Sequence, residues 1–165
     1  MPYNRVDFAM RELIASFTCL DPAGLIDRLS RTAAAVAGTA YAGFVRVDVL
    51  REVAHTVNVH APPGDPLRVR PWLEESGVLK ALSAAPGPLL IAPDLVLGEP
   101  GFLAMPLPLA TCDHGFVWVA GRRFGEPDEH LLSRFATAAG RALEAATGLE
   151  AAVRLLRGVQ AFPGT

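Results

Sequence analysis

The hydrophobic period of this sequence changes along the chain, and that change limits the folds it can adopt. Apolar residues recur every three or four positions over residues 6–17 and again over 25–36, which predicts two consecutive helices. Segments 44–49 and 54–60 then alternate apolar and polar side chains, as half-buried strands do. The helical period returns in the last quarter of the chain. Helices at both ends of an antiparallel sheet are typical of an α+β fold.

The middle of the chain predicts the remaining elements. Residues 67–70 are a candidate for a short third strand, and residues 72–82 for a short helix. Residues 89–91 predict a brief buried strand. Segments 102–109 and 116–121 flank a polar tip, so they predict a hairpin.

The last segment is the most strongly helical part of the sequence. Gly125 is the expected N-cap, Pro127 falls in the first turn, and the acidic residues that follow suit the positive end of a helix. Apolar residues then recur at alternating spacings of three and four, which indicates a seam of coiled-coil type. The seam comprises Leu131, Phe135, Ala138, Ala142, Ala146, Leu149, Val153 and Leu156.

Composition excludes several classes of protein. The 165 residues are 51% hydrophobic and 19% charged, as expected of one domain with a single core. A net charge of −2 gives no electrostatic reason to expect a nucleic acid or a membrane surface as partner. The longest uncharged stretch, Thr32–Val45, is too short to span a bilayer, and charges near the N-terminus argue against a signal peptide. We therefore expect a cytoplasmic protein.

Three stretches resemble the GAF domain, a sensory module of bacterial signalling proteins. Residues 75–94 are similar to the helix, strand and loop of that family. Phe102–Leu107 is similar to its strand that leads into a Pro-Leu step. Gly115–Ala120, followed by Phe124–Glu129 and a long helix, is similar to its final strand and helix. Together these stretches cover most of residues 21–146.

The resemblance implies an antiparallel sheet of five to six strands, GAF/PAS-like, with the N- and C-terminal helices packed on one face. The opposite face would hold a ligand pocket under the middle loops and the short helix. Residues 1–20 would form an N-terminal helix of a dimer bundle, 21–146 the GAF-like domain, and 147–165 an extension of the last helix and a tail. The expected dimer helices carry Met10, Leu13, Phe17, Phe135, Ala138, Ala142, Leu149, Val153 and Leu156.

The pocket of such a domain would be lined by apolar strand and helix residues, with arginines as candidate anchors for an anion. Packing of an ordinary core explains the apolar members equally well. The candidates are Phe44, Arg46, Val57, Val59, Arg68, Arg70, Trp72, Leu79, Phe102, Met105 and Trp118.

No metal or cofactor is expected. His55 and His60 flank apolar residues, but the loop in which haem-binding relatives place their ligand has no histidine. Cys112 and His114 lack the third and fourth ligands that zinc requires. The cyclic-nucleotide signature of the family is half present, since Phe124-(x)3-Asp128-Glu129 matches while Gly121-Arg122 stands where Asn-Lys is sought.

These observations predict a non-enzymatic sensory or regulatory GAF domain that binds a small molecule or partner and forms a homodimer. Because the sequence contains no output segment, we expect it to act through a signalling partner, such as a kinase or a transcription regulator, or within a longer protein. Two alternatives remain open. One is a degenerate GAF dimerisation scaffold without a ligand. The other is a small redox enzyme of the methionine sulfoxide reductase type that uses Cys112.

Overall fold

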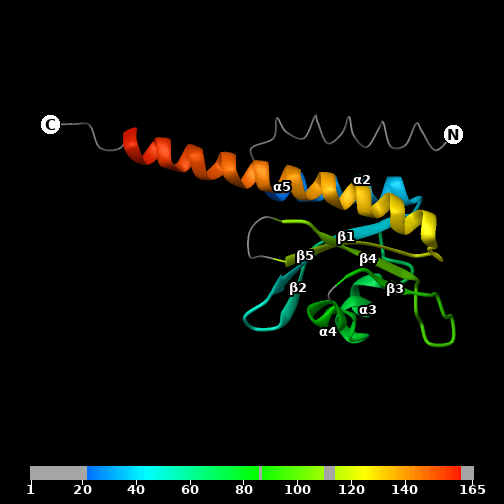
Figure 1. Cartoon of the computed structure of the whole chain (residues 1–165). Helices are drawn as coiled ribbons and strands as arrows, with labels where there is room; N and C mark the ends of the chain where they lie inside the picture. Colours follow the sequence, from blue (N-terminus) through cyan, green and yellow to red (C-terminus); the bar gives the residue numbers. More distant parts are fainter. Residues whose placement is uncertain (1–21, 86, 110–113, 161–165) are drawn as a thin grey trace.

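A computed structural model describes residues 22–85, 87–109 and 114–160 and arranges them in three layers (Figure 1). The middle layer is a five-stranded antiparallel sheet. Helices α2 (Pro22–Ala37) and α5 (Glu126–Gln160) cover one face, and α3 (Val69–Glu75) and α4 (Val78–Ala84) cover the other. From edge to edge the strands are β2 (Val53–His60), β1 (Tyr41–Asp48), β5 (His114–Ala120), β4 (Phe102–Leu107) and β3 (Leu89–Ile91). The predicted α+β fold is confirmed, while the helix expected over residues 6–17 lies outside the described residues.

The central strand β5 is buried on both faces, with every side chain from Gly115 to Ala120 shielded from solvent. Its neighbour β1 is also buried on both faces from Tyr41 to Val45. The prediction of a half-buried strand at 44–49 is confirmed from Val45 to Asp48, where burial alternates, and was wrong at Phe44, which is buried on the other face. Helices on both sides of the sheet are the reason, because a strand covered twice has no face left for polar residues.

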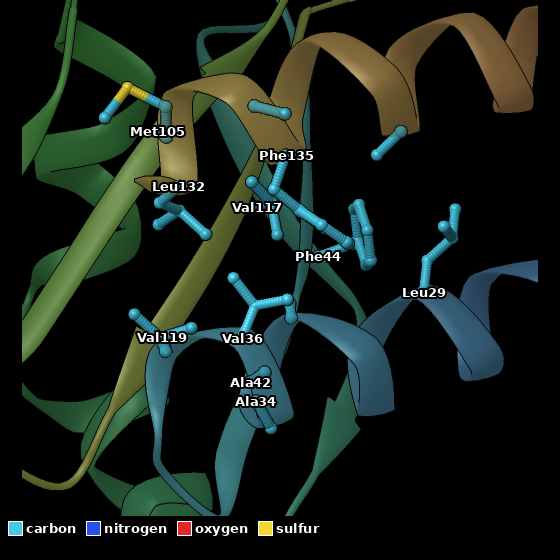
Figure 2. Close-up of a cluster of buried hydrophobic side chains, with 14 of the residues drawn as sticks. Leu29, Ala34, Val36, Ala42, Phe44, Met105, Val117, Val119, Leu132 and Phe135 are labelled. Atoms are coloured by element: carbon cyan, nitrogen blue, oxygen red, sulfur yellow. The ribbon is translucent and has the colours of Figure 1, made fainter. Parts of the chain in front are cut away.

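The helix-side core lies between the sheet and the α2/α5 pair, and Figure 2 shows its main side chains. Alanines on both helices, among them Ala33, Ala34 and Ala139, let the helix backbones approach the sheet closely. The larger residues that fill the remaining space are Leu29, Val36, Phe44, Met105, Val117, Val119, Leu132 and Phe135.

Local interactions explain the end of α2 and the start of α5, and the predicted N-cap of α5 at Gly125 is confirmed. α2 ends at Gly38, whose φ of 65° is accessible to glycine at little cost, and the next amide donates to the Ala34 carbonyl at 2.9 Å. At the start of α5 the amides of Asp128 and Glu129 donate to the Gly125 carbonyl. The Asp128 carboxylate accepts the Gly125 N–H at 2.8 Å, which satisfies one free donor of the first turn.

Arg122 joins the end of α2 to the start of α5. Its guanidinium donates to the Ala37 carbonyl at 2.6 Å and pairs with the Asp128 carboxylate at 2.7 Å. The same group lies over the Phe124 ring, 4.5 Å from the ring centroid. The hydrogen bond from Arg122 holds the pKa of Asp128 below its usual range.

The segment expected to be a third strand at residues 67–70 is instead the start of a helix. The Asp65 carboxylate accepts the N–H groups of Val69 and Arg70, both at 2.9 Å, and these bonds begin α3. The single short helix expected over 72–82 is two helices, because Gly77 adopts a φ of 82° between them.

Replacing Asp128 with Asn should lower the free energy of unfolding at neutral pH by about 1–3 kcal/mol, since it removes a charge-assisted bond at a helix start. Because the folded-state pKa of Asp128 is lowered, its stabilisation is complete above the ordinary aspartate pKa of about 4 and is lost as the pH falls through the lowered value. Urea unfolding at neutral and at strongly acidic pH measures this. Asp27→Asn is the control, because its pair with Arg31 is half-exposed. A loss of equal size at both pH values would contradict the assignment.

Replacing Gly43 with Ala should destabilise the protein by about 2 kcal/mol or more. A Cβ at this position would collide with the carbonyl oxygen of Asn58 and lie 2.6 Å from Cζ2 of the Trp118 ring. Gly148→Ala is the matched control, because nothing lies near its would-be Cβ and the helical alanine should stabilise α5 by about 0.5–1 kcal/mol. Thermal or urea unfolding of the two variants should show opposite signs.

Candidate functional site

The sheet face under α3 and α4 is packed with the protein's own side chains. This cluster, called here the α3/α4-side core, takes Val69 and Leu73 from α3 and Val78 and Leu82 from α4, all at most 3% exposed. The sheet contributes Tyr41, Val45, Val47, Phe102, Ala104, Phe116, Trp118 and Ala120. The middle of the face expected to hold a pocket is therefore filled.

Three aromatic rings run through this cluster. The centroids of Trp72 and Phe102 are 5.2 Å apart, and those of Phe102 and Trp118 are 5.8 Å apart. The Trp72 indole N–H donates to the Glu99 carboxylate at 3.0 Å and so ties α3 to the β3–β4 loop. The Trp118 indole N–H is buried without a hydrogen-bond partner. Such close ring packing stabilises the face and leaves it no room for a molecule.

A cleft of about 290 Å³ opens at one end of the same face, where α4 passes the ends of β1, β4 and β5. We call it the α4 cleft. An apolar cavity of about 150 Å³ accepts a benzene-sized molecule, so this cleft has room for a somewhat larger one. It is lined by Val47, Val49, Glu52, Leu82, Ser83, Ala85, Pro106, His114, Gly115 and Phe116.

The lining is mainly apolar, with three polar side chains. The Ser83 hydroxyl already donates to the Lys80 carbonyl at 2.7 Å. Glu52 and His114 are exposed at the rim. No arginine or lysine is among the described residues that line the cleft. The α4 cleft can therefore bury an apolar body and place one polar group beside a carboxylate.

The structure separates the apolar residues that were predicted to share a pocket. Phe102 and Trp118 lie in the α3/α4-side core, with Trp72, Leu79 and Val59 partly buried at its margin. Phe44 and Met105 lie on the opposite face of the sheet, in the helix-side core. None of these residues lines the α4 cleft.

The other predicted pocket residues lie at the surface. Arg46, Val57, Arg68 and Arg70 are all exposed. The guanidinium of Arg70 donates to the Val59 carbonyl at 3.1 Å and so holds α3 against β2. The α4 cleft has none of the arginines proposed as anchors for an anion.

The predicted pocket contains no residue of the α4 cleft, and His114 was considered only as a metal ligand, although one signal for the correct face was available. Phe102 and Met105 are three positions apart, and such residues of a regular strand point to opposite faces. Val45 and Val47 alternate in the same way with Phe44. Which residues of β1 lie opposite those of β5 depends on the strand register, and that register comes from the fold.

The seam of α5 divides into a buried part and an exposed part. Phe135 and Ala142 are buried in the helix-side core of their own chain, and Ala138 packs against it. Further along, α5 runs past the sheet (Figure 1), and Leu149, Leu155 and Leu156 are 45%, 72% and 65% exposed. Val153 is half-buried. Met10, Leu13 and Phe17 lie outside the described residues, as do Cys19 and Cys112.

Two searches of the described residues found nothing. No group of three or more His, Cys, Asp or Glu side chains in residues 22–85, 87–109 and 114–160 is placed to hold a metal ion. Within the same ranges no helix is long and apolar enough to cross a bilayer.

No protein-family model and no curated protein matches the chain. Solved structures do match. The GAF domain of a protein described as a sensor histidine kinase from Pseudomonas syringae pv. tomato is 19% identical, with a TM-score of 0.55 over 92% of this chain and 96% of that one. Residues 122 to 287 of a methyl-accepting chemotaxis protein are 16% identical, with a TM-score of 0.58 over 84% of this chain and 98% of that one.

An enzyme has a similar fold. The free methionine-R-sulfoxide reductase from Neisseria meningitidis is 16% identical, with a TM-score of 0.52 over 86% of this chain and 91% of that one. Identities this low establish a common architecture and not a common chemistry. The chain therefore has the GAF fold, which it shares with domains of signalling proteins and with this enzyme.

Proposed function

We propose that the chain is a non-enzymatic, cytoplasmic sensory or regulatory GAF domain that binds a small molecule in the α4 cleft and dimerises through the end of α5. The observation that carries the proposal is the division of α5, whose first part is packed on the sheet and whose last turns project beyond it with exposed leucines. The helix is about 50 Å long at 1.5 Å per residue. It therefore connects the sheet to a surface that is free to meet a second copy.

The sheet offers a short physical route from the cleft to α5. Phe116 of β5 lines the α4 cleft, while the next residue, Val117, packs in the helix-side core. A ligand against Phe116 is thus separated from α5 by the thickness of one strand. If β5 and α5 have two joint arrangements, a ligand that binds one of them more tightly shifts the equilibrium between them. The size of the shift equals the difference in binding free energy.

The output of such a domain would be a change in the dimer helices that a signalling partner reads, such as a kinase or a transcription regulator. The similarity of fold to a domain described as part of a sensor kinase and to part of a chemotaxis protein supports this class of partner. A scaffold without a ligand is the alternative if the cleft stays empty. A redox enzyme is the alternative if Cys112 supports turnover.

Replacing Leu149 and Leu156 together with Glu should convert a dimer into a monomer at roughly tens of micromolar protein, because charges in an apolar seam oppose helix pairing. Sedimentation velocity measures the change. The double variant should still unfold cooperatively, since the two side chains are 45% and 65% exposed in the single chain. Leu95→Glu is the control, because Leu95 is 98% exposed on a different loop. A wild-type protein that sediments as a monomer would overturn the dimer.

A thermal-shift screen against metabolites and nucleotides should identify a ligand that raises the melting temperature of the wild-type protein by several degrees. The shift should be lost in Ala85→Phe, which fills the α4 cleft, and kept in Ala84→Phe, which adds the same ring outside it. Absence of any stabilising ligand would favour the scaffold. Turnover of methionine sulfoxide that Cys112→Ser abolishes would make the protein an enzyme.

A further inference from the structure

The polar groups of the α4 cleft restrict the chemistry of its ligand. On the proposed function that this cleft is the binding site, we propose that it takes a small apolar molecule carrying a single ammonium group, which pairs with the carboxylate of Glu52. Size and charge each support this class.

The size of the α4 cleft suits a small apolar group. The volume of about 290 Å³ is roughly twice that of a cavity that holds benzene. One ring with a short side chain, or an aliphatic chain of similar bulk, is accommodated within it.

The charge of the described lining favours a cation over an anion. Glu52 supplies the one carboxylate, and His114 is the one other titratable side chain, among the described residues that line the cleft. Glu52 forms no hydrogen bond or ion pair with any described residue. A carboxylate or phosphate on the ligand would meet an unneutralised negative charge, whereas an ammonium group would gain a partner.

The hairpin turn between β1 and β2 fixes the backbone at Glu52. The Asp48 carboxylate accepts the N–H groups of Leu50 and Arg51, both at 3.1 Å, and Glu52 closes the turn with a φ of 53°. The turn therefore holds the Glu52 side chain at the rim of the α4 cleft.

The apolar part of the ligand has a preformed surface to rest on. Val47, Leu82 and Phe116 form buried parts of the lining, and Pro106 and Ala85 complete the wall. Burial of the apolar part supplies most of the affinity, and Glu52 selects the charge of the polar end.

Isothermal titration calorimetry with three probes of nearly equal size tests the proposal: n-pentylamine, n-pentanol and n-pentanoate. Wild-type protein should bind pentylamine roughly fivefold or more tightly than pentanol, and pentanoate more weakly than either. Glu52→Gln should remove the preference for the amine and keep the binding of pentanol. Glu75→Gln, an exposed glutamate of α3 outside the cleft, should leave the preference intact. About 1 M salt should weaken the preference in the wild-type protein.

The outcomes separate this inference from the proposed function. Equal binding of pentanol and pentylamine, or a preference that survives Glu52→Gln, would refute the ammonium class and leave the α4 cleft as a ligand site. If none of the three probes binds, the α4 cleft is not a ligand site, and the ligand-binding part of the proposed function is refuted. Glu52→Gly provides a second readout, because relief of the strained φ should raise the melting temperature while the amine preference is lost. A lower melting temperature in this variant would show that Glu52 is structural.

Discussion

Burial of β5 on both faces is the constraint on which the rest of the structure depends. A strand with no solvent-facing side needs a covering layer on each of its two faces. The long helices α2 and α5 provide one cover, and the short helices α3 and α4 provide the second. Single side chains fix the ends of both covering layers. Arg122 bonds to the end of α2 and the start of α5, and the Asp65 carboxylate caps the start of α3.

The same constraint leaves open space only at the margin of the α3/α4 face, among the described residues. The middle of the α3/α4 face is filled by Trp72, Phe102 and Trp118, whose rings are in contact. Space remains beside the end of α4, where β1 and β4 end and β5 begins, so these three strands bound the α4 cleft together. Adjacent residues of β5 face opposite layers: Phe116 lines the cleft, and Val117 packs in the helix-side core with α5. The α4 cleft and a helix that extends past the sheet therefore lie on opposite faces of the same strand.

Local signals in the sequence predicted most of the fold. Gly125 was correctly predicted as the N-cap of α5, where acidic residues follow it in the first turn and the Asp128 carboxylate accepts its N–H. Residues 67–70 were assigned wrongly because α3 begins at a side-chain cap from Asp65, which a periodic pattern does not reveal. The cleft was harder to predict because it depends on which strands lie side by side and in what register. It joins Val47, Leu82 and Phe116, which are far apart in the sequence. A shift in register after Phe44 also leaves Val57 without a partner on β1.

Gly43 has a consequence for the evolution of this sequence. Its missing side chain makes room for the Trp118 ring and for the backbone of β2 at the irregular pairing beside it. A larger residue at this position would collide with the Asn58 carbonyl and the Trp118 ring, so β2 or the ring would have to move. Gly43, Trp118 and the irregular β1–β2 pairing therefore form one coupled unit. We expect substitutions at Gly43 and Trp118 to compensate for each other, so that a change at one position selects for a change at the other.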